Sequence, residues 1–386
     1  MADGYGLGDL VPDISKDSIE SLLKIVAASM LGIATFAVAS MVSAYASASS
    51  TATPRSFTLV IADDVSQNAL STFIGGFIFS VVALVALTNG FYEKAGRFFL
   101  FALTVLMFVL VIVSFVRWVD SIARLGRLGT TIDKVEEATR AAFEQRLSAP
   151  LLGGIEWQPP DSQSQKISGD YIGYLQHINV AALQATAEKS QLRISVSALP
   201  GTFCTPNRPV AYVIADTSSK ISDSDKEAIT NAFEIGDARA FDQDPRFGLI
   251  ALSEISSRAL SPAVNDPGTA IDVIGTLVRL FALWGSRSKA ESAPEVRFDR
   301  IAVPGLLMQD MFDDAFMGTA RDGAGTVEVA VRLQKALETL SLLEDVEMHK
   351  SALRHAKLAL LRSETAMEIP SDIEAVRSAA NFARIV

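Results

Sequence analysis

Residues 98–116 read FFLFALTVLMFVLVIVSFV, a stretch without a charged side chain that is long enough to cross a lipid bilayer as a helix. Residues 69–88 also lack charge, and residues 22–45 carry one, Lys24, near an end. A buried helix of a large soluble protein usually keeps a polar side, and these three stretches have none. The sequence therefore predicts three transmembrane spans within a membrane region at residues 19–116.

The chain outside these spans divides by composition. A polar N-terminal segment covers residues 1–18. Residues 117–149 place apolar side chains at mostly helical spacing among charged ones, which predicts an amphipathic connecting helix at the membrane surface or against a neighbouring subunit. Prolines and glycines then indicate a linker over residues 150–165.

Residues 166–386 have the patterns of a soluble domain. Leu192, Ile194 and Val196 alternate with polar residues, as in a half-buried strand. We expect strands within residues 166–176, 192–198, 207–216 and 295–303, and helices starting near Lys226 and covering 247–259, 269–284, 304–319, 326–343, 348–362 and 371–384. The expected fold is an α+β membrane protein: about three transmembrane helices, followed by a soluble domain with a small β-sheet and a helical bundle.

Charge and cysteine content restrict partners and location. The net charge of −10 argues against non-specific nucleic-acid binding. We expect the lipid bilayer and further copies of the chain as partners. The lone Cys204 cannot form an internal disulfide, and the soluble domain therefore needs no oxidising compartment. Arginines at positions 55, 117, 124 and 127 outnumber the basic residues at 16, 94 and 97 across the membrane. Basic residues favour the cytoplasmic side of a membrane, so this majority favours a cytoplasmic soluble domain. The expected location is the inner (plasma) membrane, in which the chain is a multi-pass protein.

Small residues recur at helical spacing in two of the spans. Ala28, Gly32, Ala39 and Ser43 share one face of the first span, and Gly75 and Gly76 lie in the second. Small faces let helices approach closely in lipid, so tight packing and self-association are expected, with a water-lined pore wall as the alternative. No ionisable residue lies at mid-membrane depth, which argues against a proton relay in these spans.

Charged residues crowd the segment FEIGDARAFDQDPRFG at residues 233–248, directly before an apolar helix. Arg239, Asp242, Asp244 and Arg246 therefore predict a structural ion-pair network, with Asp266 as a further partner of the arginines. A metal held by Asp242, Asp244 and Asp266 is the weaker alternative, because their spacing matches no metal-binding loop. We expect neither a metal nor a cofactor.

The segment RALSPAVNDPGTAI at residues 258–271 concentrates helix breakers between two apolar runs. Ser261 before Pro262, and Asp266 before Pro267, each resemble a helix N-cap followed by proline at the first position. Two helix starts so close together predict a sharp corner. Its polar groups either cap the helices or bind an anion at the free backbone N–H groups, and pairing of Asp266 with an arginine is favoured over simple capping. The candidate residues of this corner are Ser261, Asn265, Asp266 and Thr269.

Three stretches, at residues 53–84, 200–203 (PGTF) and 236–274, resemble the uncharacterised bacterial membrane-protein family named domain of unknown function 2254. The resemblance covers roughly residues 18–343, and its most specific part runs from QDPRFG to NDPGTA. Family members usually have a further hydrophobic helix upstream, whereas this chain begins with a short polar segment. The resemblance implies an integral membrane protein with a soluble C-terminal domain and brings no established activity or catalytic residue.

No familiar catalytic motif occurs in the sequence: a Walker loop, GxGxxG, HExxH and GxSxG are all absent. His349 and His355 fall on different faces of a helix and are expected in solvent. The favoured function is a homo-oligomeric channel or transport-related protein with a cytosolic domain. The alternative is a membrane-anchored sensor or scaffold whose soluble domain binds an unidentified ligand or partner, and an enzyme is the third class.

Overall fold

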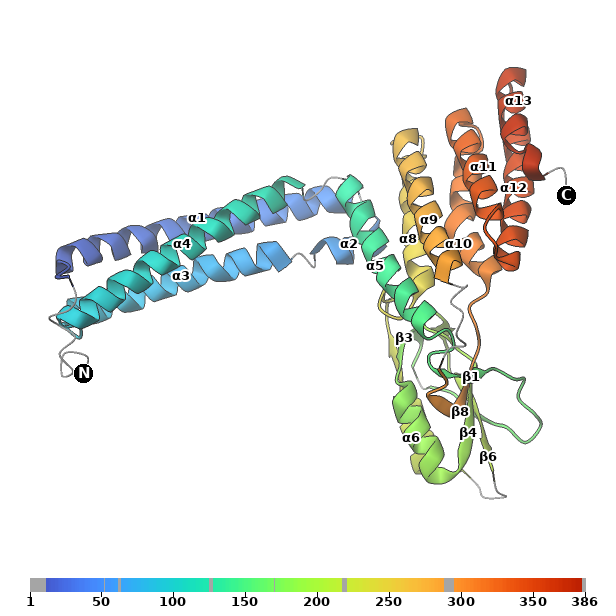
Figure 1. The fold of residues 1–386 in the computed structure, drawn as a ribbon, viewed down its shortest axis with the longest axis horizontal. Coiled ribbons are helices and arrows are strands. Elements are labelled where there is room, and N and C mark those ends of the chain that lie inside the picture. The colour runs from blue at the N-terminus through green and yellow to red at the C-terminus, as the bar shows by residue number, and fades with distance from the viewer. Residues whose placement is uncertain are drawn as a thin grey trace. The chain divides into compact units, whose positions relative to one another are not determined.

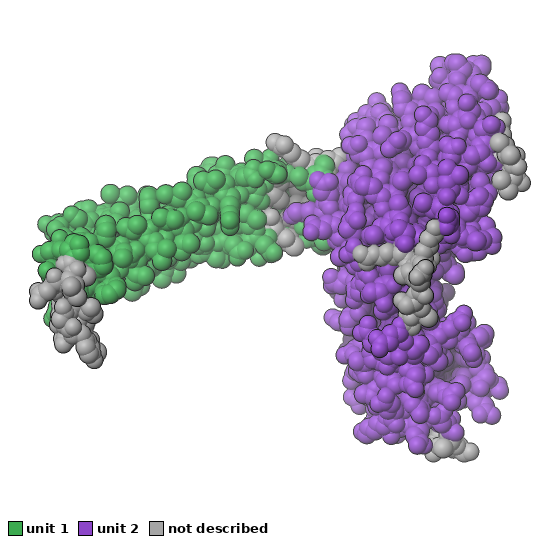
Figure 2. Space-filling model, in the orientation of Figure 1, with its two compact units in different colours: residues 1–131 green, residues 132–386 purple. Residues whose placement is uncertain are grey.

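The computed structural model describes residues 12–51, 53–61, 64–124, 128–169, 171–216, 221–287 and 295–383. Arg127, used above for orientation, most of the polar N-terminal segment and the last residue of the expected helix 371–384 lie outside these ranges. The chain forms two compact units, residues 1–131 and 132–386 (Figure 2). Each unit has a core of its own.

The first unit is helical (Figure 1). It contains α1 (Lys16–Thr51), α2 (Pro54–Ile61), α3 (Asp64–Thr88) and α4 (Lys94–Arg124). The three expected spans lie in α1, α3 and α4, and each of these helices is long and apolar enough to cross a membrane. They pack together around Met30, Phe73, Val111 and Trp118. The sequence did not indicate the short helix α2.

The second unit begins with two small sheets. Its strands are β1 (Gly154–Glu156), β2 (Gln165–Ile167), β3 (Gly173–Ile178), β4 (Leu192–Val196), β5 (Phe203–Cys204), β6 (Ala211–Ala215), β7 (Phe233–Gly236) and β8 (Phe298–Val303). A five-stranded sheet has the order β1-β8-β4-β6-β2, and a three-stranded sheet has the order β5-β3-β7. Helices α6 (Val180–Ser190) and α7 (Asp223–Asn231) accompany them.

Two sequence expectations about this region are wrong. The single strand expected within residues 166–176 is two strands in different sheets, because β2 pairs with β6 and β3 pairs with β7. The expected linker at residues 150–165 contributes β1, which pairs in parallel with β8. Strands β1 and β2 lie at the edges of their sheet and have three residues each, too few to show a clear alternation.

The remainder of the second unit is helical. It contains α5 (Leu128–Ser148) from residue 132 onward, α8 (Pro245–Ala259), α9 (Pro267–Arg287), α10 (Met308–Asp322), α11 (Val327–Ser341), α12 (Val346–Ala366), α13 (Pro370–Ala379) and a 3-10 turn (Asn381–Ala383). Helix α9 is a fourth helix apolar enough to span a membrane by composition. Its residues Val273, Leu277 and Phe281 are fully buried inside this unit, which makes α9 a core helix. The α+β fold class is confirmed.

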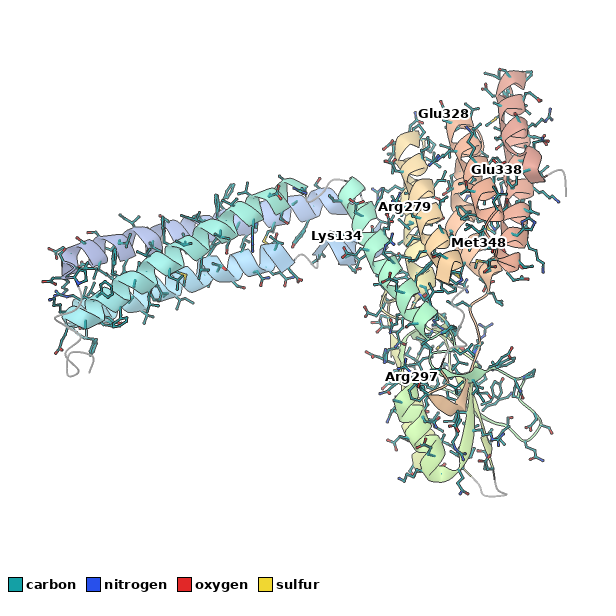
Figure 3. All side chains as sticks on the ribbon, in the orientation of Figure 1. Lys134, Arg279, Arg297, Glu328, Glu338 and Met348 are labelled. Carbon is teal, nitrogen blue, oxygen red and sulfur yellow. The ribbon has the colours of Figure 1, made fainter. Side chains whose placement is uncertain are left out.

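The amphipathic helix expected over residues 117–149 is wrong as a single surface element. Its first part belongs to α4, and α5 packs into the second unit. Phe143 of α5 is fully buried with its ring edge-on to Trp284, and Arg279 of α9, labelled in Figure 3, donates from Nε to Glu136 of α5 over 2.9 Å. The apolar side of α5 therefore faces the protein core and not lipid.

Candidate functional site

The charged segment before α8 forms a buried ion pair. Arg239 donates from Nε and Nη2 to the two carboxylate oxygens of Asp244, over 2.7 and 2.9 Å. Asp244 is 2% exposed, and it also caps α8 by accepting the backbone N–H of Phe247. Burial raises the pKa of the Asp244 carboxyl, against the lowering effect of Arg239. The guanidinium of Arg239 lies over the Phe247 ring, 5.3 Å from its centroid, so the pair is fixed on several sides.

Arg246, the second residue of α8, pairs with a different helix. Its Nε donates to Asp314 over 2.5 Å and its Nη1 to Asp310 over 2.8 Å, both on α10. Burial raises the pKa of Asp314. The two aspartates lie four residues apart on one helix face, which the sequence shows, but their pairing across more than 60 residues with Arg246 depends on the packing of α8 against α10.

A third arginine lies close to this network and was not anticipated. Arg146 of α5 is 3% exposed, and its Nη2 donates to the backbone carbonyl of Gln243 over 3.4 Å. Its Nη1 has no hydrogen-bond partner among the described residues. Burial lowers its pKa to about 10, and the charge of Asp244 acts in the opposite direction. Asp244 therefore compensates the buried Arg146 and the partly buried Arg239.

The arginines Arg239 and Arg246 line a cavity of about 290 Å³ within the second unit. Its walls come from the turn after β4 and from the loop between β8 and α10. The other lining residues are Ser197, Leu199, Pro200, Gly201, Thr202, Pro304, Gly305, Leu306, Leu307 and Asp310. Two separate sequence stretches, PGTF and the charged segment before α8, thus meet at one hollow of the structure.

The turn at Gly201 presses its backbone against the ion pair. Gly201 has φ +93°, a left-handed conformation that glycine adopts without strain. A Cβ at this position would collide with the carboxylate of Asp244 and with Nη2 of Arg239. The wall of the cavity is therefore backbone in direct contact with the ion pair.

The corner at residues 258–271 is built differently from the expectation. Helix α9 begins at Pro267 as predicted, with Asp266 accepting the backbone N–H and the hydroxyl of Thr269 over 3.1 and 2.6 Å. These hydrogen bonds lower the pKa of Asp266. No helix begins at Pro262; Ser261 instead bonds back to the carbonyl of Arg258 at the end of α8. Asn265 takes φ +48°, which asparagine tolerates in a tight turn.

The favoured pairing of Asp266 with an arginine is also wrong. Arg239 and Arg246 have the partners described above, and among the described residues Asp266 makes no ion pair. Asp242 is exposed and takes no part in the network. No group of three or more His, Cys, Asp or Glu in the described ranges could hold a metal ion. Asp242, Asp244 and Asp266 are thus not brought together.

In the first unit, the small face of α1 is exposed. Ala28, Gly32, Ala39 and Ser43 are all exposed, whereas Met30 and Ala37, on the opposite side of the helix, are buried. A Cβ at Gly32 would meet no atom within 4 Å. The packing of α1 against α3 and α4 therefore does not use these four small residues.

The paired glycines of α3 differ from each other. Gly76 is buried, with Met30 of α1 and Val111 of α4 within 3.5 Å of the position a Cβ would take. Gly75 instead borders an open groove of about 430 Å³ between α3 and α4. This groove is lined by Asn68, Ser71, Thr72, Gly75, Met107, Leu110 and Ser114. Gly76 thus allows close packing inside the unit, and Gly75 lies on its surface.

One histidine is buried, contrary to the expectation of a solvated residue. His355 of α12 is 2% exposed and lies 2.9 Å from a carboxylate oxygen of Asp313. Its ring lies near those of Phe312 and Phe316 on α10. Burial is the main reason that its pKa is lowered to about 4. His355 is a structural contact between α10 and α12.

Comparison with known proteins identifies the family of this chain. The family described as "Predicted membrane protein (DUF2254)" matches residues 3–339. The chain belongs to this family. The resemblance noted in the sequence is confirmed, and the family member is a multi-pass membrane protein with a second unit of α+β structure.

The curated relatives of this family member carry no assigned function. An uncharacterized protein of Mycobacterium tuberculosis (strain ATCC 25618 / H37Rv) is 29% identical over 179 residues, which cover 45% of this chain and 34% of the relative. An uncharacterized protein of Mycobacterium bovis matches to the same extent. The chain thus matches about a third of the length of these relatives. No solved structure matches it.

Proposed function

We propose that this protein is a homo-oligomeric channel or transport-related protein of the inner membrane, with its second unit in the cytoplasm. The observation that carries the proposal is the exposed small face of α1, formed by Ala28, Gly32, Ala39 and Ser43. In lipid, helices associate mainly by close packing, and small side chains let their backbones approach. A face of this kind directed only at lipid would lose that packing energy.

The groove between α3 and α4 supports a path for a polar solute. Most exposed residues of the spans are apolar, yet Asn68, Ser71, Thr72 and Ser114 gather at this groove. Ser71 and Thr72 donate to carbonyl groups of their own helix, which satisfies their hydroxyl protons in an apolar environment. The side-chain amide of Asn68 makes no hydrogen bond with a described residue. Oligomerisation that brings such grooves together would form a polar surface without ionised groups.

A pair of crosslinking variants tests the assembly. In a Cys204→Ser background, Ala39→Cys should form disulfide-linked dimers in membranes, because Ala39 lies on the small face. Val38→Cys is the matched control: Val38 is 45% exposed but lies about 100° around the helix from Ala39. Equal crosslinking of the two variants, or none, contradicts assembly through the small face.

Reconstitution tests the transport function. Vesicles containing the purified protein should show potassium or chloride flux above that of empty vesicles. Gly32→Leu should reduce this flux together with oligomer size in detergent, since leucine would separate the helices. Gly32→Ala keeps the face small and serves as the control. A monomeric protein without flux under either ion gradient contradicts the proposal.

The second candidate is a membrane-anchored sensor, which the cavity beside Arg239 and Arg246 favours. A hollow with a few convergent polar groups is the usual form of a ligand site. Saturable ligand binding without ion flux in the same vesicles would favour the sensor.

A further inference from the structure

We infer that the cavity beside Arg239 and Arg246 binds a small anion, either a carboxylate or a phosphate group. This site is independent of assembly through α1 and gives the chain a soluble ligand. Three features of the second unit support the inference: two guanidinium groups with unused donors, an uncapped helix start, and a cavity of small-molecule size.

Both arginines are held by carboxylates, and each still has N–H donors without a partner among the described residues. Arg239 uses Nε and Nη2 for Asp244, and Arg246 uses Nε and Nη1 for Asp314 and Asp310. Nη1 of Arg239 and Nη2 of Arg246 make no hydrogen bond with any residue that the structure describes. The side chains are 16% and 32% exposed and both line the cavity, so each arginine is only partly desolvated. The carboxylates thus fix two guanidinium planes without using all of their hydrogen atoms.

The start of α10 lies at the same cavity. Leu307, at the N-cap position, provides no side-chain hydrogen bond to the helix, and Pro304 to Leu307 line the cavity. The first N–H groups of a helix have no acceptor within the helix, and its dipole favours negative charge at this end. An anion between the arginines and the start of α10 would satisfy both sets of donors.

Asp310 determines how strong an anion site this is. It belongs to the first turn of α10, lines the cavity and bonds to Arg246, with 40% of its side chain exposed. Its charge competes with an incoming anion, whereas Asp244 and Asp314 are less exposed, at 2% and 16%, and are not among the residues that line the cavity. The ligand anion therefore takes the donors that Asp310 leaves free, and Asp310→Asn should strengthen its binding.

The volume of the cavity limits the ligand. About 290 Å³ is at the lower end of the range for ligand pockets. The cavity accommodates a small organic acid or a phosphate group better than a whole nucleotide. Gly305 lies at its exposed edge, and a Cβ there would meet no atom within 4 Å. This position accepts a side chain without disturbing the ion pairs.

Gly305 allows a test with two variants of equal size. The full chain in detergent is titrated calorimetrically with inorganic phosphate and separately with succinate, at constant ionic strength. Binding of either probe is expected, and the probe that binds identifies the group as phosphate or carboxylate. Gly305→Glu places a negative charge at the cavity and should weaken binding about tenfold or more, whereas Gly305→Gln should leave it within about twofold of the parent.

Two results overturn the inference. One is the absence of binding by both probes at millimolar concentration in the parent protein. The other is equal weakening by glutamate and glutamine at position 305, which would leave charge without a role. Arg246→Gln gives a second measurement, in which the affinity for the anion should fall about tenfold or more. Protection of the buried Cys204 from maleimide shows that the unit of this variant is folded.

Discussion

Replacing Asp244 and Asp266 separately by asparagine compares two helix starts that look alike in the sequence. Each aspartate precedes a proline, and each accepts a backbone N–H three residues on, from Phe247 over 3.2 Å and from Thr269 over 3.1 Å. Asparagine caps a helix about as well as aspartate, so both caps survive the change. Any difference between the two losses of stability therefore measures how much each carboxylate charge contributes to the free energy of unfolding.

The surroundings of the two charges predict unequal costs. Asp244 is 2% exposed and holds Arg239 through two hydrogen bonds, with the buried Arg146 close by. Removing one partner of a buried ion pair costs about 3–5 kcal/mol, because the other charge stays buried. Asp266 has only uncharged partners, the backbone N–H groups of Gly268 and Thr269 and the hydroxyl of Thr269, so Asp266→Asn should cost less than about 1 kcal/mol.

The single cysteine provides the assay. Cys204 is 3% exposed in the second unit, and burial raises the pKa of its thiol. Maleimide labelling of the full chain in detergent, across a urea series, therefore reports the unfolding of this unit. The midpoint should fall strongly for Asp244→Asn and little for Asp266→Asn. Equal shifts, or the larger shift for Asp266→Asn, would refute the distinction between a buried ion pair and a partly buried cap without an ion pair.

Three further predictions concern the glycine turn, pH and topology. Gly201→Ala should cost at least about 2 kcal/mol in the same labelling assay, because alanine is strained at φ +93° and collides with the ion pair, while Gly305→Ala should be neutral. The pKa of His355, lowered to about 4 from 6.5, means that the unfolded chain binds more protons between these values; about 3 kcal/mol of stability, fully present above pH 6.5, should be lost as the pH falls toward 4, and His355→Gln should flatten this profile. An alkaline phosphatase fusion after Val386 should be inactive if the second unit is cytoplasmic, and high activity would reverse the orientation.

The presence of the long helices was the most predictable feature of this chain. The spans were found because an uninterrupted apolar run of about 20 residues is typical of a transmembrane helix, and α8 to α12 because apolar residues recur at helical spacing. The sheets were harder. Alternation identified β4, and the expected strands at 207–216 and 295–303 contain β6 and β8, whereas β1 and β2 have three residues each and show no periodic signal. The Pro-rich stretch around β1 resembled a linker because proline and glycine mark turns regardless of what lies between them.

The candidate site was only partly predictable. The sequence brought Arg239, Asp244 and Arg246 together as a charged cluster before a buried helix, and it marked Asp266 as a helix start. It could not assign partners, because Arg246 pairs with residues more than 60 positions away and Arg146 approaches from α5. Burial of His355 was likewise hidden, since its neighbours Phe312 and Phe316 belong to another helix.

The sequence by itself determined that the chain spans a membrane, that an α+β unit follows, and that charges gather before α8. These properties depend on local composition and periodicity, which act over a few turns of helix or one strand. Only the tertiary structure decided which side of α1 remains exposed, which carboxylate holds which arginine, and that the PGTF turn meets the start of α10 at one cavity. Such pairings follow from the packing of elements distant in the chain, where a buried charge must find a partner wherever the fold provides one.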